Sequence, residues 1–381
     1  MPRSRAIKTP SGLTVPSIPV STELIGLRFT LQAVESSALY AQYTIGLHAW
    51  FLHQIQDFDP ELSAYLHDGE SEKPFTITGL DGQFASHHQQ LQLQAGATYH
   101  WHLTALSKPV VRGIVKWLKQ LPDTLELRDA PLTIQAIEIS HPSTTYTKLW
   151  KQATDQQGNV NLSFLSPSSF RRKGHHFPLP VPFNLFHSYL RRWNDFSKRP
   201  VEQDEFLDWI DEHVIIHQLT LDSAKIAAGK RGSVTGFMGA IRLGLTKRAQ
   251  QNPEFCQLFY ALVQLAPYCG TGHKTTFGLG QTQLGWVTSD SSDAPDAPSS
   301  TRDLLLAERI AELTQIFVAQ RKRIGGDRAT HISETWATVL ARRELGDSLT
   351  DIATDLDIPY ATAKTYSKLA RRSLRESESQ R

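Results

Sequence analysis

The chain has 381 residues, more than a single hydrophobic core usually contains, so we expect two or three domains. Apolar residues make up 40% and charged residues 20% of the chain, which is typical of folded proteins and excludes a disordered one. Because the formal net charge is only +2, a nucleic-acid-binding surface has to arise from local clusters of basic residues.

Cysteine content and hydropathy narrow the class of protein. Cys256 and Cys269 lie in one apolar stretch, which does not indicate a disulfide framework, and two cysteines alone cannot form a tetrahedral zinc site. Residues 1–19 are polar and contain prolines, without the apolar segment of a signal peptide. Polar residues and a proline interrupt the longest apolar run, so no membrane span is expected. These features favour a reducing, cytoplasmic environment.

The first part of the chain alternates between strand-like and helix-like segments. Strands are expected where apolar and polar residues alternate, and helices where apolar residues recur every three or four positions. In chain order we expect a strand at 24–30, helices at 37–57 and 60–67, strands at 73–80 and 98–106, a helix at 109–119 and a strand at 132–139. The order β-α-β-β-α-β is that of a ferredoxin-like unit.

A second set of segments follows, with a joint near residues 156–159. We expect strands at 160–165, 214–221, 232–245 and 281–287, with helices at 181–196 and 253–265. The fold class predicted for this part is α+β, with two tandem ferredoxin-like (RRM-like) units at residues 1–157 and 158–288.

The last part of the chain differs in composition. Residues 289–301 (SDSSDAPDAPSST) are acidic and rich in serine and proline, which is linker composition. Beyond them, residues 302–381 are expected to form an all-α domain, with helices at 302–320 and 331–345. Residues 348–372 resemble the helix-turn-helix of sigma-factor region four and of response regulators. Asp357 stands in the turn where glycine is common, and aspartate tolerates a left-handed backbone there.

The second helix of this motif carries the side chains that would contact nucleic acid. The helix-turn-helix resemblance implies that one set faces a groove and that two arginines reach phosphates. An alternative is a helical module that docks on protein, so DNA, RNA and protein all remain candidate partners of this domain. The groove-facing residues are Tyr360, Thr362, Lys364, Thr365 and Lys368, and the phosphate-contacting ones are Arg371 and Arg372.

Residues 269–280 (CGTGHKTTFGLG) form the most informative segment of the chain. Its glycines can adopt positive φ and expose N–H groups that hold phosphate, and Lys274 adds positive charge. The spacing fits neither a P-loop nor a dinucleotide-binding fingerprint. A mobile surface loop is the alternative. The glycines are Gly270, Gly272, Gly278 and Gly280.

An apolar residue followed by Gly-x-Gly, five residues and Gly-x-Gly resembles the C-terminal glycine-rich loop of the CRISPR-associated RAMP endoribonucleases. Further segments resemble the same family in the same order: residues 60–76 (PELSAYLHDGESEKPFT), 166–194 (SPSSF to LRRWN) and 236–239 (GFMG). The resemblance extends from about residue 24 to residue 286. It does not include the tail.

The resemblance implies an enzyme that cleaves CRISPR precursor RNA within its repeats, without a metal ion or other cofactor. A base activates the ribose 2′-hydroxyl, which attacks the adjacent phosphorus and leaves a 2′,3′-cyclic phosphate and a 5′-hydroxyl. The implied partners are the CRISPR repeat RNA and other subunits of a CRISPR effector complex.

Three residues of the first unit match catalytic positions of the family. His67 follows the "YL" of the first-domain helical segment, His48 lies on a helix that carries a second histidine in some members, and Lys73 precedes the "F-T" strand. Histidine suits proton transfer because its ordinary pKa is close to neutrality. The alternatives are an exposed histidine at a helix end, a core histidine and a solvated lysine, respectively.

RNA binding is expected from the glycine-rich loop and from a basic cluster beside the family's central segment. Phosphate contacts made by such residues give affinity that depends strongly on salt. Two rivals to the enzyme remain: a catalytically silent subunit that binds repeat RNA, and a DNA-binding regulator. The predicted RNA-binding residues are Gly270, Gly272, His273, Lys274, Gly278, Gly280, Arg171, Arg172, Lys173, Arg191 and Arg192.

Overall fold

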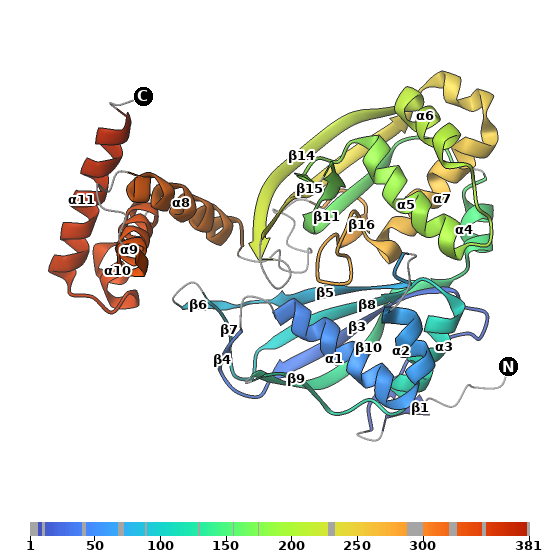
Figure 1. Ribbon diagram of the computed structural model, residues 1–381. Coiled ribbons are helices and arrows are strands. Elements are labelled where there is room, and N and C mark those ends of the chain that lie inside the picture. Colours follow the sequence, from blue (N-terminus) through green and yellow to red (C-terminus); the bar gives the residue numbers. More distant parts are fainter. Residues whose placement is uncertain are drawn as a thin grey trace. The chain divides into compact units, whose positions relative to one another are not determined.

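The structure is a computed structural model (Figure 1). It describes residues 7–9, 12–39, 43–67, 72–87, 90–128, 130–154, 156–173, 175–227, 233–287, 300–319, 326–344 and 348–378. These residues form two compact parts: the body, residues 1–84 with 91–297, and a second part, residues 298–381 with 85–90. Almost all of the predicted linker at 289–301 lies outside the described residues.

The first half of the body is a ferredoxin-like unit, as predicted. Its five-stranded sheet has the order β5-β8-β3-β10-β9, and every neighbouring pair is antiparallel. Helices α1 and α3 contact one face of this sheet (Figure 1). The elements are β3 (Leu24–Ala33), α1 (Tyr43–Phe58), α2 (Pro60–His67), β5 (Phe75–Gly82), β8 (Thr98–Ala105), α3 (Lys108–Leu118), β9 (Thr124–Leu127) and β10 (Ala130–Thr144).

Alternation along the central strands explains why this sheet forms. On β3, Leu27, Phe29 and Leu31 are buried, while Arg28 between them pairs with Glu138 of β10 at 2.7 Å. Because successive side chains of a strand point to opposite faces, one face packs against the helices and the other carries polar groups.

The second half of the body repeats this topology, which confirms the second ferredoxin-like unit. The sheet order is β14-β15-β11-β16, again with antiparallel neighbours. The elements are β11 (Val160–Ser168), α5 (Pro182–Phe196), α6 (Gln203–His213), β14 (Val214–Ala227), β15 (Ser233–Leu245), η1 (Lys247–Gln251), α7 (Pro253–Cys269) and β16 (Thr282–Leu284).

Several elements differ from the sequence prediction. The helix expected from residue 37 begins at Tyr43, and Ser37–Ala38 form a short strand, β4, that pairs with β7. The prediction did not include α4 (Tyr146–Gln152) or α6. The remaining short elements are β1 (Ile7–Lys8), β2 (Thr14–Val15), β6 (Ala85–His87), β7 (Gln90–Leu93), β12 (Phe170–Arg172) and β13 (His175–Phe177).

Buried hydrogen bonds join the two ferredoxin-like units of the body. The Thr104 hydroxyl on β8 donates to the carbonyl oxygen of Tyr268 on α7 at 2.5 Å. The Tyr268 hydroxyl in turn donates to the carbonyl oxygen of Pro142 in the first unit at 2.8 Å. A residue from each unit therefore helps to satisfy the main chain at the junction, and the end of α7, where the glycine-rich loop starts, lies at this junction.

The tail, residues 298–381, is all-α as predicted. It contains α8 (Ser300–Ala319), α9 (Gly326–Glu344), α10 (Leu349–Asp355) and α11 (Tyr360–Glu378). Leu313, Phe317 and Leu340 are buried in a core of the tail's own. Between α10 and α11, Asp357 has φ 50°, the left-handed conformation expected at this turn. In the described part of the chain, no helix is both long and apolar enough to cross a membrane.

Candidate active site at the junction of the two units

His48 lies half-buried on α1, against aromatic rings from both ferredoxin-like units. Its imidazole stacks on Phe75 of β5, with ring centroids 5.9 Å apart. The imidazole also contacts Phe277 of the glycine-rich loop, with ring centroids 4.4 Å apart. A segment of the second unit thus completes the surroundings of a candidate catalytic residue in the first.

The electrostatic surroundings of His48 connect it to the other two candidates. The pKa of His48 is lowered from 6.5 to about 4, mostly by burial and in the same direction by the nearby charges of His67 and Lys73. All three effects disfavour the imidazolium form. At neutral pH His48 is therefore a neutral imidazole that can accept a proton.

His67 and Lys73 lie on either side of a short connection. His67 is the exposed last residue of α2, and Lys73 Nζ donates to the His67 carbonyl oxygen at 2.6 Å. This bond satisfies one of the carbonyl groups that a helix end leaves open. The structure therefore brings together the three predicted catalytic residues, His48, His67 and Lys73, from α1, the end of α2 and the segment before β5.

We expect Phe277→Ala to raise the pKa of His48 from about 4 toward 6.5, because the phenyl ring contributes to the burial that lowers it. Titration of the histidine ring protons by NMR measures this change. As a control, Phe84→Ala removes a ring that packs on Tyr99 and should leave the pKa of His48 unchanged. A pKa of His48 near 6.5 in the unaltered protein would contradict the account.

The glycine-rich loop is packed into the body, so the prediction of an open phosphate cradle is wrong at three of its glycines. The Gly270 N–H donates to Ala266 O, the Gly272 N–H to Ser188 Oγ and the Gly280 N–H to Pro167 O, at 2.9, 3.0 and 3.1 Å. These N–H groups are occupied by protein acceptors. Nor does the segment lie wholly on the surface, as the alternative of a mobile surface loop requires, because Thr271 is fully buried.

The loop also reaches the first unit. The Ile77 N–H of β5 donates to the carbonyl oxygen of Thr275 at 3.1 Å, and Gly278 forms an isolated parallel bridge with Thr78. Figure 1 shows this loop, in orange between α7 and β16, beside β5. The glycines therefore hold Phe277 over His48, and their contact with RNA stays a prediction.

Arg191 and Arg192 belong to an ion-pair network rather than to one exposed surface. Both pair with Glu72, the residue before Lys73, and the Glu72 N–H donates to Asp195 Oδ2 at 2.7 Å. The prediction of an exposed RNA contact is wrong for Arg192, which is only 4% exposed and donates to the Gly272 carbonyl at 2.8 Å. Arg192 joins the Lys73 segment to the glycine-rich loop, whereas Arg191 is half exposed.

The basic cluster lies on a hairpin beside this loop. Arg171 and Arg172 end β12 and are exposed, as is Lys173 in the turn. His176 of β13 lies 5.3 Å, ring to ring, from His273 of the loop. Burial lowers the pKa of Lys274, and the Arg171 charge lowers it further, so these two cations are close to each other. The predicted RNA-binding residues of the hairpin and of the loop therefore form one basic cluster.

Replacement of Arg171, Arg172 and Lys173 by glutamine is expected to reduce the slope of log affinity for repeat RNA against log salt by about 2, the value for three phosphate contacts to a single strand. Fluorescence anisotropy across a salt series measures the slope. The matched control, named the α3 variant, replaces three exposed cations of α3 and its C-terminal cap with glutamine: Arg112, Lys116 and Lys119. An equal slope in both variants would exclude the hairpin from the interface.

Comparison with known families identifies the two halves of the body. The sequence model of the CRISPR Cas6 N-terminal domain matches residues 27–157, and that of the CRISPR-associated endoribonuclease Cas6 matches residues 162–282. The chain belongs to the Cas6 family. Neither match extends into the tail.

Solved Cas6 structures share the fold of the body. A Cas6 product complex is 24% identical, with a TM-score of 0.54, and covers 69% of this chain and 99% of its own. Thermus thermophilus Cas6 is 20% identical, with a TM-score of 0.51, and covers 70% and 99%. A Cas6-related protein from Pyrococcus furiosus is 12% identical, with a TM-score of 0.51, and covers 69% and 98%. Among curated protein sequences, none matches this chain.

Sequence reasoning missed two residues that build the site. Phe277 is an aromatic residue between two Gly-x-Gly pairs. An apolar side chain at this position of a loop is the sequence feature that could have indicated packing against the rest of the protein. Glu72 follows a run of polar residues and gives no sequence signal, because its two arginine partners are more than a hundred residues away.

Proposed function

We propose that this Cas6 protein cleaves CRISPR precursor RNA within its repeats and so generates guide RNAs. The ribose 2′-oxygen attacks the adjacent phosphorus, and the bond from phosphorus to the 5′-oxygen of the next nucleotide breaks. The products are a 2′,3′-cyclic phosphate and a 5′-hydroxyl. No water is consumed in this step, because the nucleophile belongs to the RNA.

The observation that carries the proposal is the meeting of His48, His67 and Lys73 beside the glycine-rich loop. Internal attack on a phosphodiester requires a base, an acid and a positive charge near the phosphorus. Two imidazoles and an ammonium group supply these three functions. Because His67 and Lys73 both affect the charge state of His48, the three residues form a single site rather than three separate surface positions.

We assign the base to His48 and the acid to His67. The low pKa of His48 keeps its imidazole neutral, so it can take the proton of the 2′-hydroxyl. His67, exposed at the end of α2, gives a proton to the leaving 5′-oxygen. Lys73 stabilises the extra negative charge of the phosphorane.

The basic cluster is proposed to hold the RNA backbone. Arg171, Arg172 and Lys173 are exposed on the β12–β13 hairpin, and His176 connects that hairpin to the glycine-rich loop. Since the loop also contacts His48, an RNA strand bound on the cluster has a short path to the catalytic residues. Salt-dependent affinity is the expected property of such contacts.

The test is to incubate the full-length protein with a repeat RNA from its own genome in the presence of EDTA. One cut per repeat, with a cyclic phosphate and a 5′-hydroxyl at the new ends, supports the proposal. RNA that is bound but stays intact would favour a catalytically silent RNA-binding subunit. Cleavage that EDTA abolishes would contradict the assignment of the three side chains as sufficient.

A further inference from the structure

We propose that the tail binds duplex DNA through the exposed face of α11, a function separate from RNA cleavage in the body. Three basic residues of α11, Lys364, Lys368 and Arg371, form a pattern that neither a core nor an ion pair within the described residues explains. The buried face of α11 is made of small residues, among them Ala363 and Ala370, and is already packed in the tail. The exposed side of α11 beside this buried face is therefore available for another molecule.

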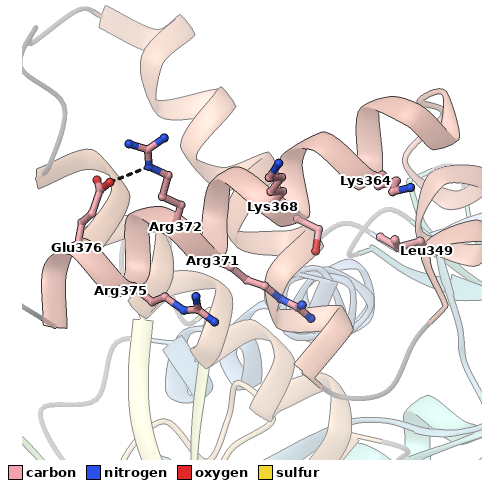
Figure 2. A pocket seen from close by; sticks show the side chains of 8 residues that line it. Leu349, Lys364, Lys368, Arg371, Arg372, Arg375 and Glu376 are labelled. Carbon is pink, nitrogen blue, oxygen red and sulfur yellow. Dashed lines mark hydrogen bonds and ion pairs between the residues drawn. The ribbon is translucent and has the colours of Figure 1, made fainter.

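Four cations run along one stripe of α11. Lys364, Lys368, Arg371 and Arg375 follow one another at four-, three- and four-residue steps, and all four are exposed. Residues at such steps lie on one side of a helix, and a span of eleven residues is about 16 Å long. Figure 2 shows these side chains and Arg372 along the helix, with Leu349 of α10 near the Lys364 end.

The stripe borders a hollow of about 730 Å³ between α11 and the start of α10. Five of the eight residues that line this hollow carry a positive charge, and Glu376 carries the negative one. Glu376 pairs with Arg372 at 2.9 Å, so its charge is directed to that arginine. The lining residues are Leu349, Lys364, Ser367, Lys368, Arg371, Arg372, Arg375 and Glu376.

Within the described residues, no carboxylate pairs with Lys364, Lys368 or Arg371. Like charges three or four residues apart on a helix repel each other and destabilise it. Repulsion among Lys364, Lys368 and Arg371 therefore lowers the stability of the free protein. A polyanion bound along the helix would remove this repulsion, and its regularly spaced phosphates match a stripe of this length better than a small anion does.

Among polyanions, the geometry favours a DNA duplex. Single strands are held by stacking on aromatic side chains, and Tyr360, 52% exposed, is the one aromatic residue more than a third exposed in the described part of the tail. An α-helix enters the major groove of B-form DNA, whereas side chains cannot read the deep, narrow major groove of duplex RNA. Thr365, exposed between Lys364 and Lys368, could then reach base edges.

The test compares three full-length proteins: the unaltered chain, the α11 variant (Lys364→Gln, Lys368→Gln, Arg371→Gln) and the α3 variant. The α3 variant removes the same charge from positions with the same spacing, on α3 of the body and its C-terminal cap. Binding of a 30-base-pair DNA duplex is measured by fluorescence anisotropy over a salt series. We expect the α11 variant to lose at least tenfold in affinity and about 3 in salt slope.

The same proteins are assayed for repeat-RNA cleavage, which the α11 variant should perform at the unaltered rate. Circular dichroism of each variant confirms that the helices remain folded. The proposal is wrong if the α3 variant loses DNA affinity equally, or if the α11 substitutions weaken the binding of an RNA duplex of the same length as much as that of the DNA duplex. It is also wrong if the unaltered protein does not bind the DNA duplex at all.

Discussion

His67→Ala is expected to lower the rate of repeat-RNA cleavage by about 10²–10⁴-fold, the usual worth of a positioned acid or base. The side chain is exposed at the end of α2, so its removal should change the free energy of unfolding by less than about 0.5 kcal/mol. RNA affinity should stay close to that of the unaltered protein. Single-turnover cleavage at saturating protein, with affinity measured separately, distinguishes the two effects.

The matched control is His53→Ala. His53 is also a histidine on the surface, lies five residues beyond His48 on α1, and pairs with the exposed Asp57 at 3.8 Å. We expect this variant to cleave at the full rate. If both alanine variants cleaved equally, or if His67→Ala lost affinity in proportion to rate, His67 would have no role in the chemistry.

Gly272→Ala is expected to destabilise the body by about 3 kcal/mol or more. Gly272 has φ 82°, and a Cβ atom there would lie 2.3 Å from the carbonyl oxygen of Ser169. Both the left-handed backbone and the clash with main chain oppose any side chain. Because the same loop places Phe277 against His48, cleavage should fall together with stability. Thermal unfolding followed by circular dichroism measures the loss.

Gly285→Ala is the control that separates the cost of the left-handed backbone from the cost of the Cβ clash at Gly272. Gly285 also has positive φ, 99°, but nothing lies within 4 Å of its Cβ position. A loss of about 1 kcal/mol from the left-handed conformation alone is expected there. If Gly272→Ala unfolded at the same temperature as the unaltered protein but bound RNA less tightly, the loop would contact RNA directly and the packing account would be wrong.

Periodicity was sufficient to predict the fold of the body. Strands such as β3 and β8 bury alternate residues against helices, so apolar residues recur at every second position of their sequence. Helix α6 was missed because seven of its eleven residues are polar or charged, and its four buried ones, Phe206, Leu207, Trp209 and Ile210, fall close together. Helix α4 has only seven residues, too few to show a period.

The candidate site was predicted in part, and the limit has a physical cause. The resemblance to a family indicated His48, His67 and Lys73, which share one end of the first unit. Arg192 was assigned to an RNA surface because a sequence shows its charge but not its partners, Glu72 and Gly272, which come from distant segments. The glycines likewise indicated a close approach of the main chain, but not that Ser169 of this same chain is the group approached.

The most direct test of the proposed mechanism removes a single oxygen atom from the substrate. A repeat RNA with 2′-deoxyribose at the nucleotide before the cut lacks the nucleophile that His48 is proposed to activate. The account predicts that the full-length protein binds this RNA with unchanged affinity and does not cut it, while the ribose form is cut under the same conditions. Cleavage of the deoxy substrate at the same position would contradict attack by the 2′-hydroxyl, and with it the roles proposed for His48, His67 and Lys73.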